Sequence, residues 1–164
     1  DNMTLEGKEA AITALEMQHP RGGTNIWQGV VAGMETLRKP SKEQGWRQSA
    51  IMLLTDGIPD SRPPSGEVVE LKAYKEAHPD FRFQLNTFGF GYYLNSRILL
   101  ELATEGGGTF AFIPDAMIVG TAFVNSICNS LSTQTQNATL HLMAKGGAQF
   151  TQPVIGISPD MIID

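Results

Sequence analysis

The sequence predicts an α/β fold, namely a doubly wound (Rossmann-like), mostly parallel sheet with helices on both faces. Short apolar runs the length of one buried strand alternate with amphipathic stretches the length of a helix. The predicted strands near residues 47–55, 81–88 and 109–113 are separated by enough residues for a helical crossover, which needs about a dozen. Parallel strands that are joined by right-handed crossovers form a doubly wound sheet.

Length and composition are those of an ordinary globular chain. The 164 residues include 41% hydrophobic and 18% charged residues, which is enough apolar material for a core. The formal net charge is −5 and the Lys and Arg residues are scattered, so we expect no nucleic-acid partner. No apolar run approaches the roughly 18 residues of a membrane span. The single cysteine, Cys128, has apolar neighbours and is predicted to be a buried thiol.

The first third of the chain is predicted to contain two helices and then a strand. Thr4 is a candidate N-cap for a helix over about residues 5–18. The tight loop Gly22–Asn25 precedes a second helix over about residues 26–39, whose apolar residues recur at helical spacing. The strand in Ser49–Gly57 is an apolar run that ends abruptly in Thr55, Asp56 and Gly57.

The rest of the α/β pattern ends before residue 137. A loop rich in proline and glycine, residues 58–66, is predicted to cross the carboxyl end of the sheet. Further helices are predicted over residues 67–77, 94–104 and 116–131. Beyond them, apolar residues lie among Gly, Thr and Gln, which favours strands without helices. We therefore expect an α/β domain over residues 1–135 and a β-rich tail over residues 136–164 that could begin a following domain.

Asp56 and Thr24 are the candidate metal-binding residues. Asp56 lies at the carboxyl end of a strand, where open α/β sheets bind ligands, and Gly57 leaves room beside it. Thr24 follows two glycines that allow the backbone to approach a bound group. Carboxylate and hydroxyl oxygens suit a hard cation such as Mg²⁺. Each residue also has a structural interpretation, because Asp56 could cap the following turn and Thr24 could cap the next helix.

In their order and spacing, these motifs resemble those of the von Willebrand factor type A (VWA) domain. The resemblance runs from about residue 3 to residue 132 and rests on five segments: Gly22–Ile26, Ile51–Gly57, Leu85–Gly91, Leu99–Gly108 and Thr109–Ile113. In that family a metal ion-dependent adhesion site binds Mg²⁺ or Mn²⁺, and a carboxylate of a protein partner commonly completes the coordination. The resemblance implies that Thr24 and Asp56 belong to such a site and that the chain is a protein-interaction module.

One motif of the family, the Asp-x-Ser-x-Ser loop after its first strand, is absent from the sequence. In the family, that strand, the first helix and a hairpin would all precede Asp1. The resemblance therefore implies a domain that is truncated at its amino-terminal half, a fragment of a longer protein. We expect residues 50–54 to form an open sheet edge and the remaining two ligands to bind Mg²⁺ weakly.

Two other functions remain open from the sequence. The domain could be a metal-independent structural scaffold, because the first motif of the metal site is absent. A Mg²⁺-dependent hydrolase would need a second acid or base near Asp56, and only Asp60 and Glu105 are candidates. Neither has an informative spacing, and Asp60 is otherwise expected to be a solvated loop carboxylate. No arrangement for nucleophilic catalysis is evident, so we expect the chain not to be an enzyme.

Overall fold

The computed structural model describes residues 4–19, 22–39, 48–132 and 143–147. The chain divides into two compact units, residues 1–130 and residues 131–164. In the second unit, the described residues 143–147 include a turn in which Gly146 and Gly147 have positive φ angles. The strands predicted for the tail lie outside the described residues.

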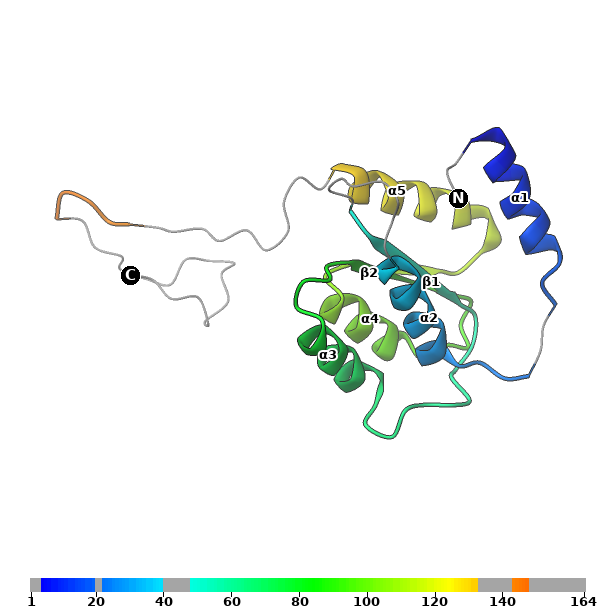
Figure 1. Ribbon diagram of the computed structural model, residues 1–164, viewed down its shortest axis with the longest axis horizontal. Helices are drawn as coiled ribbons and strands as arrows, with labels where there is room; N and C mark the ends of the chain where they lie inside the picture. The colour runs from blue at the N-terminus through cyan, green and yellow to red at the C-terminus, as the bar shows by residue number, and fades with distance from the viewer. Residues whose placement is uncertain (1–3, 20–21, 40–47, 133–142, 148–164) are drawn as a thin grey trace. The chain divides into compact units, whose positions relative to one another are not determined.

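The helices and strands of the first unit follow the predicted order (Figure 1). They are α1 (Leu5–Glu16), α2 (Ile26–Arg38), β1 (Ala50–Thr55), α3 (Glu67–Ala77), β2 (Gln84–Phe90), α4 (Ser96–Glu105), β3 (Phe110–Ile113), a 3₁₀ turn (Ala116–Ile118) and α5 (Val119–Ser132). The start of β2 differs from the prediction by three residues. Phe81 and Phe83 were expected in the strand, but their rings stack on each other just before it, with centroids 5.1 Å apart.

The three strands that the structure describes form one parallel sheet in the order β1-β2-β3. Thr55 of β1 is paired with Gly89 of β2, and Gly89 is paired with Phe112 of β3. β2 is therefore the central strand, and the carboxyl ends of all three strands meet at one edge of the sheet. Within the described part of the chain, β1 pairs with β2 alone, so its other side is an open edge.

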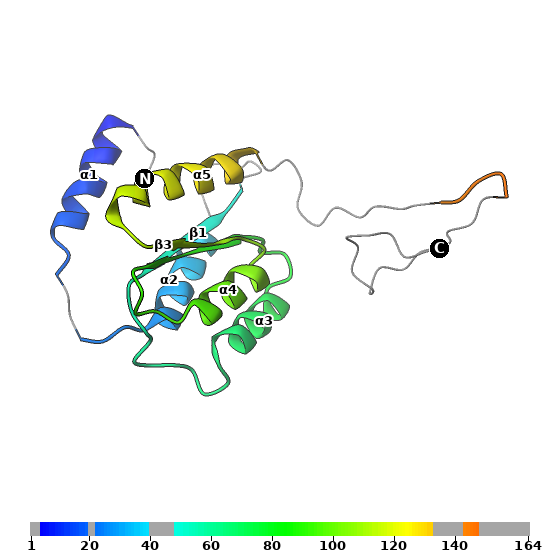
Figure 2. The same ribbon diagram turned by 180° about the vertical axis from the view of Figure 1, so that it is seen from behind.

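Helices cover both faces of the sheet, which confirms the predicted fold class. Figures 1 and 2 show α2, α3 and α4 on one face and α5 on the other. The main core lies beneath the three helices, where α2 packs on β1 and α4 packs on β2. Its buried members are Ile26, Val30, Met34, Leu71, Leu85, Ile98, Leu99 and Leu102.

An aromatic pair joins α5 to the opposite face of the sheet. The rings of Phe88 in β2 and Phe123 in α5 stack with centroids 4.5 Å apart, and Ser126, one turn later, is buried. Cys128 is exposed, so the prediction of a buried thiol was wrong. Two residues correspond to about 200° of rotation in an α-helix, so a residue two positions from Ser126 faces away from the sheet.

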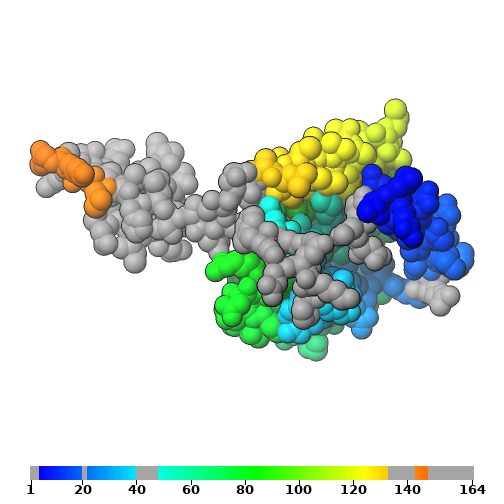
Figure 3. Space-filling view, turned by 45° about the horizontal axis from the view of Figure 1, so that its top comes forward, coloured from blue at the N-terminus to red at the C-terminus, as the bar shows by residue number. Residues whose placement is uncertain are grey.

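α1 is capped as predicted but has no buried residue. The Thr4 hydroxyl accepts a hydrogen bond of 3.2 Å from the Gly7 amide. Its larger apolar residues, Leu5, Ile12 and Leu15, are exposed, and Figure 3 shows the blue atoms of α1 at the surface. Capping and local hydrogen bonds therefore define this helix within the described structure. None of the described helices has the length and apolar character that crossing a membrane requires.

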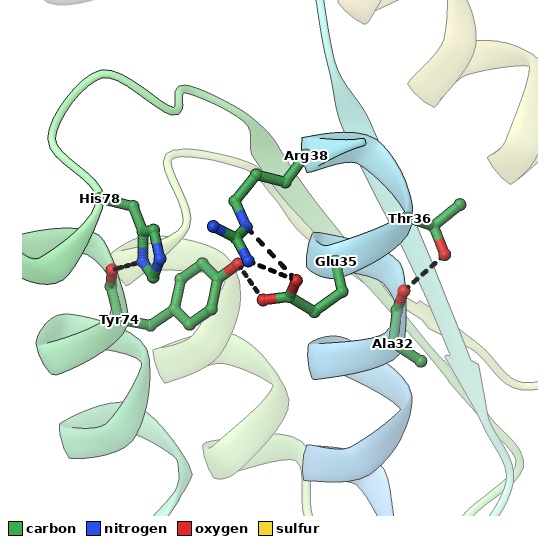
Figure 4. Close-up of polar contacts among 6 residues, drawn as sticks. All are labelled: Ala32, Glu35, Thr36, Arg38, Tyr74 and His78. Carbon is green, nitrogen blue, oxygen red and sulfur yellow. Dashed lines mark hydrogen bonds and ion pairs between the residues drawn. The ribbon is translucent and has the colours of Figure 1, made fainter. Parts of the chain in front are cut away.

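Glu35 joins α2 to α3 (Figure 4). Its carboxylate accepts hydrogen bonds of 2.8 Å from the Tyr74 hydroxyl and 2.7 Å from Arg38 Nη2. The hydrogen bond from Arg38 lowers the pKa of the Glu35 carboxyl most, and that from Tyr74 lowers it further. Burial and the nearby carboxylate raise the pKa of Tyr74. The ring of His78, at the end of α3, lies 4.4 Å from that of Tyr74, and the hydrogen bond from Tyr74 to Glu35 holds α3 beside α2.

The turn from α4 into β3 runs unusually close to the backbone of β2. The amide of Leu85 donates a hydrogen bond of 3.1 Å to the Gly106 carbonyl. A Cβ atom on Gly108 would collide with the carbonyl group of Leu85, and one on Gly106 would collide with the Leu85 side chain. The glycines at these positions therefore allow the backbones to meet.

Replacing Gly108 with alanine should lower the free energy of unfolding by about 2 kcal/mol or more, because the added methyl group meets backbone rather than a movable side chain. Gly29→Ala is the matched control, since a Cβ there has no neighbour within 4 Å and alanine favours the helical interior of α2. Urea unfolding followed by circular dichroism measures both. Equal stability of the two variants would contradict this description of the turn.

A buried carboxylate attaches the loop of residues 58–66 to α3. Arg62 donates to both oxygens of Glu67, with Nη2–Oε2 and Nε–Oε1 distances of 2.7 Å and 2.8 Å. The side chain of Glu67 is 1% exposed, whereas that of Arg62 is 49% exposed. The hydrogen bonds from Arg62 lower the pKa of Glu67 and outweigh the opposing effect of burial. Glu67 is therefore an ionised anchor for the loop.

Stability should depend on the ionisation of Glu67. Its folded-state pKa lies below the unfolded value of about 4.3, so its contribution is complete above that pH and is lost as the pH falls through the folded-state pKa. Glu67→Gln should cost about 1–3 kcal/mol at pH 7, and this difference should shrink below about pH 4.

Urea unfolding of the parent chain and of Glu67→Gln at pH 7, 5 and 3 measures this effect. Glu76→Gln, at an exposed position of the same helix, is the control and should change stability by less than about 0.5 kcal/mol. A deficit of Glu67→Gln that stays constant over the whole pH range would show that the charge of Glu67 is not its source.

Candidate functional site

Asp56 lies at the carboxyl edge of the sheet, directly after β1. The pairing of Thr55 with Gly89 places it beside the end of β2. The structural alternative, in which Asp56 caps the following turn, does not hold, because no amide of the described residues donates to its carboxylate; the Gly57 amide donates to the Thr55 hydroxyl (3.4 Å). The Asp56 carboxylate is exposed and makes no hydrogen bond or ion pair with any residue that the structure describes. Its oxygens are therefore available to a ligand.

Thr24 lies in the loop before α2 and faces the turn that follows β1. The N-cap of α2 is Asn25, whose Oδ1 accepts a hydrogen bond of 2.9 Å from the Gln28 amide, so the expectation that Thr24 caps this helix was wrong. The Thr24 hydroxyl lies 3.5 Å from the point where a Cβ atom on Gly57 would be. Among the described residues it has no hydrogen-bond partner. The fold thus brings Thr24 beside the Asp56–Gly57 turn.

Asp60 holds the two loops together, which the sequence did not reveal. Its Oδ2 accepts a hydrogen bond of 2.6 Å from the Thr24 amide, and its own amide donates to the Thr24 carbonyl over 2.9 Å. A side chain on Gly23 would collide with the Asp60 carboxylate. The expectation of a merely solvated carboxylate was therefore wrong. The two glycines before Thr24 indicated a close approach at this loop, but not which group approaches.

Glu105, the other acid considered for a hydrolase, lies at the opposite edge of the sheet. It is the last residue of α4 and precedes Gly106, whose carbonyl accepts a hydrogen bond from the Leu85 amide at the start of β2. Its carboxylate contacts Lys75 Nζ at 3.0 Å and Lys72 Nζ at 3.7 Å. Asp56 lies beyond the other end of the strands, so Glu105 cannot act on the same bound group as Asp56.

The oxygen atoms at the carboxyl edge are of the chemical types that bind a hard divalent cation. Thr24 offers a hydroxyl and Asp56 a carboxylate, and neither has a partner within the described structure. Mg²⁺ takes such oxygens in octahedral geometry and readily keeps several waters. The described residues contain no group of three or more His, Cys, Asp or Glu side chains placed to hold a metal. A cation here would accordingly have two protein ligands from the described part of the chain.

Sequence comparison identifies one distant relative. No model of a known protein family matches the chain. The chain is 24% identical, over 162 residues, to an uncharacterized protein of Synechocystis sp.. The aligned region is 98% of this chain but only 37% of that protein. The chain thus spans little more than a third of the length of this relative.

Solved structures with a similar fold include the two described here. The von Willebrand factor type A protein from Catenulispora acidiphila gives a TM-score of 0.62 at 23% identity, over 78% of this chain and 28% of its own. BatB, a conserved hypothetical protein from Bacteroides thetaiotaomicron, gives a TM-score of 0.55 at 19% identity, over 76% of this chain and 70% of its own. Together with the parallel sheet and the helices on both its faces, these similarities show that the chain has a fold like that of a von Willebrand factor type A domain.

Proposed function

We propose that this chain is a protein-interaction module of the VWA type, in which Thr24 and Asp56 contribute ligands to a bound Mg²⁺ or Mn²⁺ ion. The observation that carries the proposal is the position of the two side chains. They come from loops on either side of α2 and β1, yet Thr24 lies next to the turn that holds Asp56. Both have oxygens that no described residue uses.

The chemistry of the ion explains how such a site would recognise a protein. An octahedral ion has about six coordination positions, so two protein ligands leave most of them to water or to a partner. A carboxylate of a protein partner is a suitable ligand, because it supplies both an oxygen and a neutralising charge. The loop of residues 58–66, which is attached through Asp60 and Arg62, would flank the partner. This function needs no acid, base or nucleophile, and we propose no catalytic activity.

A metal-independent scaffold is the second candidate, and two observations favour it. Asp60 already joins the Thr24 loop to the loop after β1 through protein hydrogen bonds, so this edge needs no ion to keep its shape. Ile58, Tyr92 and Tyr93 are also exposed in the loops that follow β1 and β2. Tyrosine is enriched at protein interfaces, where it contributes apolar area together with a polar group. Such a surface could bind a partner without a cation.

Binding of Mn²⁺ to the 164-residue chain distinguishes the two candidates. Titration followed by electron paramagnetic resonance of free Mn²⁺ should show one weak site. Asp56→Ala should weaken it by about tenfold or more, the equivalent of about 1.4 kcal/mol, because the ion loses its only charged ligand among the described residues. Thr24→Val, which removes the hydroxyl while keeping the side-chain shape, should weaken binding less.

Asp80→Ala is the matched control, since Asp80 is an exposed carboxylate in the loop before β2, away from the carboxyl edge. It should leave the Mn²⁺ affinity unchanged. Equal affinity of Asp56→Ala and the control would remove the cation from the proposal and leave the metal-independent scaffold. Circular dichroism of each variant verifies that the fold is intact.

A further inference from the structure

The contact between Asp60 and Thr24 goes beyond an ordinary loop contact. It is reciprocal, because the Thr24 amide donates to Asp60 Oδ2 (2.6 Å) while the Asp60 amide donates to the Thr24 carbonyl (2.9 Å). Hydrogen bonds to an ionised acceptor are about twice as strong as those between neutral groups. Both backbone polar groups of Thr24 are thus bonded to one residue, and the backbone position of Thr24 is set from the loop that carries Asp56.

The neighbouring glycine is adapted to the same contact. The Asp60 carboxylate occupies the space that a side chain on Gly23 would fill. Two residues further along the same loop, Arg62 is attached to the buried Glu67. Asp60 therefore belongs to a segment that is attached to α3, so its position does not depend on Thr24. It can instead fix the position of Thr24.

We infer that Asp60 is a positioning residue, which holds the Thr24 hydroxyl over the Asp56–Gly57 turn through the Thr24 backbone. The effect of this positioning on cation binding rests on the function proposed above. Loops joined by a preformed contact lose less conformational entropy when a ligand binds between them. In this inference Asp60 acts through Oδ2 as the hydrogen-bond acceptor of the Thr24 amide, rather than as a ligand of the ion.

Amide hydrogen exchange in the metal-free chain tests the positioning directly. In Asp60→Ala the Thr24 amide loses its acceptor, and its exchange should accelerate by about tenfold or more. Asp60→Asn keeps an acceptor oxygen at the same place without the charge, so exchange of Thr24 should remain within a few-fold of the parent. The Leu85 amide of β2, which donates to the Gly106 carbonyl, should be unaffected in both variants and reports on global unfolding.

Mn²⁺ titration of the same variants tests the consequence for the site. Asp60→Ala should weaken binding by about tenfold, whereas Asp60→Asn and the control Asp80→Ala should bind like the parent. If Asp60→Asn weakened binding as much as Asp60→Ala while Thr24 stayed protected from exchange, Asp60 would act through its charge or as a ligand, and the inference would be wrong.

The exchange measurement decides the inference even if the proposed function fails. A parent chain that binds no Mn²⁺ would overturn the cation site, yet slow exchange of Thr24 that depends on an acceptor at residue 60 would still establish the positioning contact. Unchanged Thr24 exchange in Asp60→Ala would overturn it whatever the metal affinity. Should Asp60→Ala fail to fold, Asp60→Gly and Asp60→Ser, compared with Asp60→Asn, apply the same test.

Discussion

The parallel pairing of β1 with β2 is the constraint on which the rest of the structure depends. Parallel strands must return to the same end of the sheet by a crossover, and here α3 provides it. The loops after β1 and β2 therefore open at one edge, where ligand sites of open α/β sheets are found. β2 is fixed from both sides, since the Thr87 hydroxyl donates to the Leu99 carbonyl (2.8 Å) and Phe88 stacks on Phe123.

The same sheet has polar and apolar groups that the described part of the chain leaves unmatched. Asn86 in β2 accepts hydrogen bonds from the amide and hydroxyl of Thr109, yet its Nδ2 has no partner within the described structure. β1 is apolar and uncharged, and its outer edge pairs with no described strand. Edge strands of soluble proteins usually carry charges or bulges that prevent further pairing. β1 has no charged residue that would prevent another strand from pairing with its outer edge.

Carboxylates near the carboxyl edge have three different roles, which their contacts distinguish. Glu67 is buried and neutralised by Arg62, so it is a structural anchor. Asp60 is exposed but bonded to the Thr24 backbone, so it organises the loops. Asp56 is exposed and unengaged within the described structure, which makes it the carboxylate that is available to an ion or a partner. Their local sequences do not reveal these differences, because each lies in or beside a polar loop.

The sequence by itself determined the fold class, the order of the elements and the two candidate residues, because these depend on local hydrophobic periodicity and on the residues that end each strand. Only the tertiary structure decided that Asn25 rather than Thr24 caps α2, that Cys128 faces solvent and that Asp60 joins the loops. Each of these depends on which groups meet after the crossovers close. Gly23 and Asp60 are distant in the chain, and no periodicity or spacing encodes their approach.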